Sequence, residues 1–402
     1  MKIVVAHNFY QQAGGEDRVF HAERDLLRAH GHQVEEFLLH NDAVATMGQL
    51  KLAAATIWNR SSHVAMRDLV SSFKPDIVHV HNTMPLMSPS VYYAARARGA
   101  AVVQTLHNYR LLCPKALLFR DGAACEECVG RTIPLPAIKH KCYRDSRAAS
   151  AALATMLTIH KTAGTYSHKV DMYITPTEFA RTLFLRGGLS ADRVITKPHF
   201  VAPVPEIGTG SGNYAIFVGR LSPEKGLDTL LAAWRTLPGI PLKIIGDGPL
   251  APQVEAAVRD NPAIQWLGRQ PTEQVMQFVG DAAFLVFTSQ VYETFGLVAA
   301  EAFAKGTPVI AATGGATAEL ISPNVTGHHF TNNDPADLAA IVRRTLADPL
   351  ALAQMRRAAR QEFLNRYTAD ENYRQLMRIY KNAIAIRFPS QTPTASLEPD
   401  PA

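Results

Sequence analysis

The feature that most constrains the fold of this 402-residue chain is an alternation of short apolar runs with helical patterns, which stops once and then resumes. Residues 16–31 carry apolar side chains on one helical face and end at Gly31, as an amphipathic helix would. Strands and helices that alternate in this way favour a parallel sheet covered by helices. In the first half, apolar runs typical of buried strands lie at residues 2–7, 76–81, 101–107 and 172–177.

Residues 201–213, rich in proline and glycine, separate the two alternations and are interpreted as a linker. We therefore expect two tandem Rossmann-like, doubly wound α/β domains with a deep cleft between them. Their expected bounds are 1–200 and 214–365, followed by a C-terminal helix at 366–388 and a disordered tail at 389–402. In the second half, the strand-like runs are 214–219, 242–248, 263–268, 283–289 and 308–313, and helical patterns follow at 335–347 and 350–385.

The composition is typical of a globular protein, with 47% hydrophobic and 19% charged residues. No apolar run is long enough to span a membrane. The first ten residues, MKIVVAHNFY, lack the length and cleavage site of a signal peptide and are interpreted as a first strand. We therefore expect a cytoplasmic protein.

The net charge of +6 is concentrated in the first half, where residues 1–200 hold 24 Lys and Arg against 16 Asp and Glu. An anionic membrane surface or a nucleic acid would suit such an excess, and solvated loop charge is the simpler alternative. The cluster lacks interleaved aromatic residues for base stacking, so no nucleic-acid partner is expected. The clustered basic residues are Arg131, Lys139, Lys141, Arg144 and Arg147.

Ligands of parallel sheets bind beyond the carboxyl ends of the strands, so the residues that follow each strand are the first candidates for a site. The run at 214–219 ends at Gly219 and is followed by Arg220 and Lys225, and the run at 242–248 ends in a tight turn with Gly246 and Asp247. Two cations beside helix N-termini predict a diphosphate site.

The stretch ETFGLVAAE, residues 293–301, follows the run at 283–289 and contains two glutamates. A helix is expected to begin near Phe295 and Gly296, which would leave the amide groups of Leu297 and Val298 free for a phosphate. Glu293 would then lie in the preceding loop and Glu301 in the second turn. Carboxylates of this kind commonly accept hydrogen bonds from ribose or sugar hydroxyls.

The first domain offers its own candidates at the same edge. Gly15 opens the first expected helix, and His107 ends the run at 101–107. His79, His81 and Asn82 lie at the end of the run at 76–81. A lone histidine is more often structural, but one that directly follows a parallel strand at a cleft is a good candidate for function.

These motifs resemble the family-four retaining glycosyltransferases of the GT-B fold over about residues 1–385. The specific matches are FVGRLSPEKGLDTLL at 217–231, IIGDGP at 244–249 and ETFGLVAAEAFAKGTPVIAATGG at 293–315. The resemblance implies a nucleotide-sugar donor held by the second domain. Arg220 and Lys225 would bind its diphosphate, Glu301 its ribose and Glu293 its sugar.

The resemblance also implies that Gly15 approaches the diphosphate and that His107 lies beside the transferred sugar. A nucleoside diphosphate would depart with retention at the anomeric carbon, and cationic side chains would replace a catalytic metal ion. The acceptor would be a saccharide or a lipid-linked molecule, as in bacterial-type cell-surface polysaccharide or glycolipid synthesis. The alternatives are a nucleotide-sugar epimerase of the same fold and a non-catalytic nucleotide-sugar-binding protein.

The four cysteines lie within 30 residues, in an insertion at 110–147 outside the family pattern. The C-x2-C pair with two further thiols is compatible with a structural zinc site. Two disulfides, an iron–sulfur cluster and free thiols are the alternatives, of which disulfides fit a cytosolic protein poorly. The four residues are Cys113, Cys125, Cys128 and Cys142.

Overall fold

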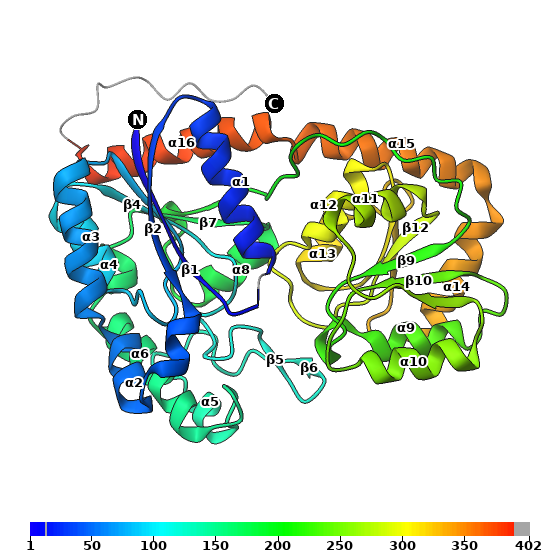
Figure 1. Cartoon of the computed structure of the whole chain (residues 1–402), viewed down its shortest axis with the longest axis horizontal. Coiled ribbons are helices and arrows are strands. Elements are labelled where there is room, and N and C mark those ends of the chain that lie inside the picture. Colours follow the sequence, from blue (N-terminus) through cyan, green and yellow to red (C-terminus); the bar gives the residue numbers. More distant parts are fainter. Residues whose placement is uncertain (13, 390–402) are drawn as a thin grey trace.

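The computed structural model describes residues 1–12 and 14–389, so most of the expected disordered tail lies outside the described residues (Figure 1). It contains two six-stranded parallel sheets, one in each half of the chain. The expected pair of Rossmann-like domains is thereby confirmed. None of the helices in the described part of the chain is long and apolar enough to cross a membrane.

The first sheet has the strand order β2-β1-β3-β4-β7-β8, with helices on both faces (Figure 1). Its strands are β1 (Lys2–Phe9), β2 (Gln33–His40), β3 (Ile77–Asn82), β4 (Ala101–Thr105), β7 (Met172–Thr175) and β8 (Val194–Thr196). The helices around it are α1 (Gly15–Ala29), η1 (Asn41–Thr46), α2 (Gln49–Ile57), α3 (Arg60–Phe73), α4 (Ser90–Ala97), α6 (Arg147–Thr162), α7 (Thr165–His168), α8 (Glu178–Arg186) and η2 (Ala191–Arg193).

The second sheet has the order β11-β10-β9-β12-β13-β14. From β9 the strands are added toward one edge of the sheet, and from β12 they are added toward the other edge. Its strands are β9 (Ala215–Val218), β10 (Leu242–Ile245), β11 (Ile264–Trp266), β12 (Phe284–Phe287), β13 (Val309–Ala312) and β14 (Gly327–Phe330). The helices are η3 (Pro223–Lys225), α9 (Leu227–Trp234), α10 (Ala251–Asp260), α11 (Thr272–Asp281), α12 (Leu297–Ala304), α13 (Gly315–Leu320), α14 (Pro335–Ala347) and α15 (Pro349–Arg366).

Successive strand residues point to opposite faces of each sheet, and both faces are apolar. In β1, Val4 packs into one buried cluster, while Ile3 and Val5 pack into the cluster on the other face. In β9, Phe217 and Ile216 are divided between two clusters in the same way. Continuous apolar runs such as KIVVA follow from this, because a parallel sheet is buried on both sides.

The last helix, α16 (Ala369–Arg387), returns to the first domain and lies along it (Figure 1). Thr368 caps α16 by accepting a hydrogen bond from the Glu371 amide. Leu376, Ile379 and Tyr380 pack into the same cluster as the strands of the first sheet. The chain therefore passes between the domains twice, once at 201–213 and once before α16.

The insertion between β4 and α6 contains little regular structure. It has two strands of two residues each, β5 (Phe119–Arg120) and β6 (Ala123–Ala124), and one five-residue helix, α5 (Leu135–Lys139). The insertion lies at the bottom of the first domain in Figure 1, and its β5–β6 hairpin extends toward the second domain.

Candidate functional site

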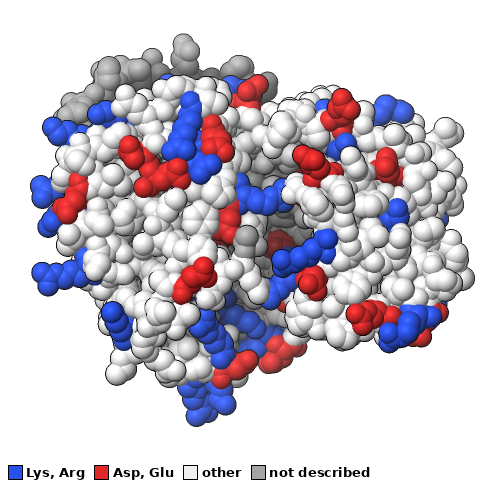
Figure 2. Space-filling model, in the orientation of Figure 1, with Lys and Arg blue, Asp and Glu red and all other residues white. Residues whose placement is uncertain are grey.

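The reversal of strand order in the second sheet places the segments after β9 and β12 on either side of one crevice. Arg220 is exposed after β9, and Glu293 follows β12. The predicted candidates of the second domain therefore gather at one edge of the sheet. Figure 2 shows Lys and Arg side chains on both sides of a hollow between the two domains.

Lys225 and Glu293 contact each other in this crevice. The Lys225 Nζ lies 2.5 Å from Glu293 Oε1, which also accepts a hydrogen bond of 2.7 Å from Ser289 Oγ. Burial alone would raise the pKa of Glu293, but the Lys225 ammonium and the two hydrogen bonds lower it below its ordinary value. The side chain of Lys225 is 28% exposed, so an anionic ligand can reach it.

Two glycines allow the backbone of the crevice to pack closely. Gly296 has φ of 99° and precedes the first turn of α12, where Leu297 and Val298 are half-buried. The first amide groups of a helix have no intrahelical partner, so this turn can receive an anion. Gly246 has φ of 136°, and a Cβ there would lie 1.8 Å from the carbonyl oxygen of Gly219.

Asp247 and Phe295 have different surroundings. Asp247 is exposed at the tip of the turn after β10, where its Oδ1 accepts a hydrogen bond of 2.7 Å from the Gly248 amide. Phe295 is buried and makes an edge contact with the ring of His199. Asp247 is thus available to a ligand, whereas Phe295 supports the loop from beneath.

Glu301 is buried in α12 and forms an ion pair with Arg18 of α1 in the first domain. Burial raises the pKa of Glu301, and the guanidinium of Arg18 offsets only part of that effect. The pair therefore joins the two domains at the residue that sequence reasoning assigned to a ribose.

The loop that carries Glu293 is held by the first domain at several points. The Thr294 hydroxyl donates to the carbonyl oxygen of His107 at 2.8 Å, and the Tyr109 hydroxyl donates to that of Glu293 at 3.1 Å. Thr177 donates to the carbonyl oxygen of Thr294 at 3.0 Å. His107 and the E-x7-E segment, which are far apart in the sequence, are therefore neighbours across the cleft.

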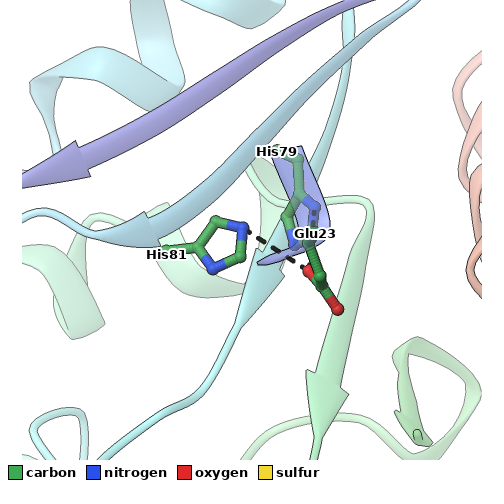
Figure 3. A group of neighbouring side chains, drawn as sticks. All are labelled: Glu23, His79 and His81. Carbon is green, nitrogen blue, oxygen red and sulfur yellow. Dashed lines mark ion pairs between the residues drawn. The ribbon is translucent and has the colours of Figure 1, made fainter. Parts of the chain in front are cut away.

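A chain of polar side chains leads from His107 into the first domain. His107 Nε2 lies 2.9 Å from His81 Nδ1, and His81 Nε2 lies 3.6 Å from the Glu23 carboxylate (Figure 3). The other oxygen of Glu23 accepts a hydrogen bond of 2.5 Å from Lys197, and both of these side chains are fully buried. His199 stacks on His107 with ring centroids 5.2 Å apart.

Burial keeps the histidines of this series of polar side chains neutral. It lowers the pKa of His107 and His81 well below the ordinary value, and lowers that of His199 to about 3. The pKa of His79, next to Glu23, falls to about 4 for the same reason. Neutral imidazoles can pass hydrogen bonds along the chain, because each ring then has one donor and one acceptor nitrogen.

Glu23, His79 and His81 lie close enough to be considered as metal ligands, as do His7, Glu16 and Asp17. Lys197 already neutralises Glu23, however, and both ring nitrogens of His79 are hydrogen-bonded, to Tyr380 and Thr105. The first group is therefore better described as a buried polar cluster, in which Glu23 Oε2 and His81 Nε2 face each other at 3.6 Å without a hydrogen bond.

Glu16 lies beside Gly15 at the start of α1, where Gly15 itself is exposed. Burial is the main reason that the pKa of Glu16 rises to about 8, and a hydrogen bond of 3.2 Å from Asn108 only partly opposes it. Next to it, a cavity of about 30 Å³ lies at the ends of β3 and β4, with Asn82, His81 and His107 in its wall.

Sequence reasoning missed Glu16, Arg18, Glu23, Tyr109 and Lys197. Glu16 directly follows Gly15, Arg18 lies three residues after it, Tyr109 lies two residues after His107, and Lys197 follows β8. The rule of inspecting strand ends would therefore have found these four. Glu23 carries no such signal, because its partner comes from a distant part of the chain.

The structure also gathers the four cysteines. No disulfide joins them, and they line one small cavity of about 10 Å³ inside the insertion, together with Lys115 and Arg120.

Residues 207–362 match the family model described as "Glycosyl transferases group 1". Over 297 residues, the chain is 34% identical to the glycogen synthase of Mycobacterium tuberculosis, which covers 72% of this chain and 64% of that protein. It is 25% identical over 332 residues to D-inositol 3-phosphate glycosyltransferase 1 of Catenulispora acidiphila, covering 77% and 72% of the two chains. The chain thus spans less than two thirds of the length of the glycogen synthase.

Two solved structures share the overall architecture. Sucrose-phosphate synthase from Thermosynechococcus elongatus superposes with a TM-score of 0.72 at 18% identity, covering 96% of this chain and 99% of that one. Anabaena HepE, solved in complex with UDP and glucose, superposes with a TM-score of 0.65 at 18% identity, covering 95% and 99%. The whole chain therefore has the GT-B fold. Its second domain matches the group 1 glycosyltransferases over residues 207–362.

Proposed function

We propose that this protein is a retaining glycosyltransferase, which moves a sugar from a nucleoside-diphosphate sugar to an acceptor hydroxyl. The observation that carries the proposal is the crevice between β9 and β12, where Arg220, Lys225, Glu293 and the first turn of α12 converge. The names of its relatives support it, since both the glycogen synthase and the inositol phosphate transferase are sugar transferases.

The diphosphate of the donor would bind between Arg220, Lys225 and the amides of Leu297 and Val298. Lys225 would exchange its contact with Glu293 for one with a phosphate oxygen. Glu293 would then be free to accept hydrogen bonds from the donor sugar, and Ser289 would continue to hold it in place. Glu301 would receive the ribose hydroxyls while Arg18 balances its charge.

The polar chain of the first domain would orient His107 toward the sugar. The carboxylate of Glu23 favours a proton on His81 Nε2, which makes His81 Nδ1 an acceptor for the proton on His107 Nε2. Nδ1 of His107 would then be left as an acceptor for a sugar hydroxyl. The low pKa of His107 suits this role, because a charged imidazolium has no acceptor nitrogen.

In the reaction, the bond between the anomeric carbon and the diphosphate oxygen breaks, and a bond to the acceptor oxygen forms on the same face. The acceptor proton passes to the departing diphosphate. Arg220 and Lys225 stabilise the negative charge that develops on the leaving group, which is the task a divalent metal performs elsewhere. No catalytic metal or other cofactor is required by this scheme.

The acceptor would enter from the first domain, past the cavity beside Asn82 and Glu16. Helices α2, α5 and α6 pack together at this end and expose both apolar and basic residues. Such a mixture suits an anionic lipid surface, so we assign a saccharide or lipid-linked acceptor at the cytoplasmic face of a membrane, in polysaccharide or glycolipid synthesis. The exposed residues include Leu50, Trp58, Ile133, Leu135 and Ile159, with Lys51, Arg131, Lys139 and Lys141 beside them.

The membrane assignment is tested with liposomes of neutral or anionic lipid at low salt. Binding to the anionic vesicles that weakens with salt is expected, and the variant Ile133→Ser/Leu135→Ser should bind less. If anionic vesicles do not retain the protein at low salt, the membrane is removed from the proposal.

The transferase itself is tested by thermal shift with UDP, GDP, ADP and dTDP, followed by product analysis with the matching nucleotide sugar. We expect one nucleotide to stabilise the protein, Lys225→Ala to lose that shift, and the control Arg235→Ala on the outer end of α9 to keep it. Release of the nucleoside diphosphate with a glycosylated acceptor distinguishes a transferase from an epimerase. Binding without turnover for every acceptor would favour the non-catalytic alternative.

A further inference from the structure

Four cysteines from separate parts of the insertion converge on one cavity. Cys113 follows β4, Cys125 and Cys128 follow the β5–β6 hairpin, and Cys142 follows α5. Cys113 and Cys128 are buried, at 8% and 6% exposure, and the cavity of about 10 Å³ between the four is the size of one water molecule or one ion.

We propose that the four thiolates of Cys113, Cys125, Cys128 and Cys142 hold one structural Zn²⁺ ion. A tetrahedral set of four cysteines, one pair of which is spaced C-x2-C, is a usual structural zinc site. Zinc bonds to sulfur at about 2.3 Å, and no three of the four sulfur atoms lie mutually within 4.8 Å among the described residues. The ion would therefore draw the four thiolates together around the cavity.

The charge of the surroundings supports a metal bound by thiolates. Four thiolates and one Zn²⁺ carry a net charge of −2, and such a charge is costly to bury without compensation. Lys115 and Arg120 both line the cavity. The basic residues that follow in the insertion, among them Lys139 and Lys141, add to the positive potential there.

The backbone of the insertion gives an independent reason for a metal. Of the eleven non-glycine residues with positive φ in the described part of the chain, six lie between residues 116 and 145. Each left-handed residue costs about 1 kcal/mol, and the two-residue strands and the single turn of α5 provide few hydrogen bonds to offset that cost. Metal binding supplies free energy to small segments that cannot build a sufficient core. The six residues are Ala116, Leu118, Asp121, Lys141, Arg144 and Asp145.

The C-x2-C segment also contacts the rest of the molecule near the cleft. Glu126, between the two cysteines, lies 2.7 Å from Arg186 of α8. The amide of Cys113 donates to the carbonyl oxygen of Tyr109, whose hydroxyl holds the Glu293 loop. The zinc ion would thus order the surface on which this loop rests.

The test is elemental analysis combined with a thiol count, on tag-free protein purified under reducing conditions from zinc-supplemented cells. We expect about one zinc ion per chain, and a strong loss of zinc from Cys128→Ser. The matched control is His140→Ala, because His140 lies in the same segment and is a possible ligand by chemistry, yet does not line the cavity. This variant should retain its zinc.

Measurements on the wild-type protein test the proposal even if the cysteine variant does not fold. Chelation should lower the Tm, and adding zinc should restore it; substitution with Co²⁺ should give the absorption of a tetrahedral thiolate complex. Three results would each overturn the proposal, all with well under one zinc ion per chain. They are four reactive thiols, two disulfides, or iron together with labile sulfide. None of these measurements depends on transferase activity, so this site and the proposed reaction can fail separately.

Discussion

The two sides of the cleft use charged residues in different ways. In the second domain, Arg220 is exposed and the Lys225–Glu293 pair is partly open to solvent. In the first domain, Glu23 and Lys197 form a pair in which both side chains are fully buried. An open pair can exchange one partner for a ligand, whereas a buried pair has no replacement available. The charged pair of the second domain can therefore open to receive a ligand, whereas the charged pair of the first domain keeps its side chains in one arrangement.

This contrast agrees with where the family resemblance lies. The family model covers residues 207–362, which hold the open pair, and stops short of the buried chain and the cysteine insertion. The family match therefore lies in the second domain, although the glycogen synthase and the solved structures also align with parts of the first domain. Each of the following predictions tests one side of that contrast.

The largest effect is expected at the open pair. Lys225→Ala should lower turnover by about 100-fold to 1,000-fold, because it removes a cation from the developing charge on the leaving group. Its stability should fall by less than about 1 kcal/mol, since the pair is partly exposed. Steady-state kinetics and urea unfolding measure the two quantities, with Arg235→Ala as the control. Unchanged turnover would remove Lys225 from the mechanism.

At the buried pair, stability should suffer most. Lys197→Met leaves the charge of Glu23 without a partner and should cost about 3–5 kcal/mol of unfolding free energy. The double variant Glu23→Gln/Lys197→Met removes both charges and should recover much of that loss, as a double-mutant cycle in urea would show. If Lys197→Met were no more costly than Lys225→Ala, the contrast between the two sides would be wrong.

A smaller effect is expected where the two sides meet. Tyr109→Phe removes the hydrogen bond to the carbonyl oxygen of Glu293 but keeps the ring in the core. One such hydrogen bond typically contributes about 0.5–1.5 kcal/mol. If that free energy is lost from transition-state binding, kcat/KM decreases several-fold. Tyr93→Phe, in α4 away from the cleft, provides the control. An equal effect from both variants would indicate a general loss of stability instead.

The smallest effect concerns Glu16 and depends on pH. The pKa of this carboxyl is raised from 4.5 to about 8, so the folded state keeps a proton that the unfolded state releases above about pH 4.5. Stability is therefore lost as pH rises from about 4.5 to 8. Glu16→Gln avoids this loss, and its Tm should exceed that of wild type by about a degree or two at pH 8 and converge with it near pH 4.5. A difference independent of pH would contradict the raised pKa.

The sequence predicted the architecture well because both sheets are parallel and buried on two faces. Runs such as those in β1, β9 and β12 are continuously apolar and easy to recognise. The three strands of the large sheets that sequence reasoning missed, β2, β8 and β14, all lie at sheet edges, where exposure shortens or interrupts the apolar pattern. Their detection needs the partner strand as well as the local residues.

The same distinction applies to the site. Arg220, Lys225, Glu293 and Glu301 could be proposed from local motifs, because the first three follow strand ends and Glu301 lies in the helix that begins after β12. The contact of Glu301 with Arg18 and that of Glu293 with Tyr109 depend on how two domains meet, which no local pattern encodes. Cysteine spacing indicated a set of candidate ligands, but only the folded insertion brings all four to one cavity.

The return of α16 to the first domain has a consequence for how the protein is made. The hydroxyl of Tyr380 bonds to His79, 301 residues earlier, and the helix around it closes one face of the first sheet. Domains usually fold in the order in which the ribosome releases them. Here the first domain has to wait with an open apolar face until the final helix has been synthesised, so the second domain can be complete before the first.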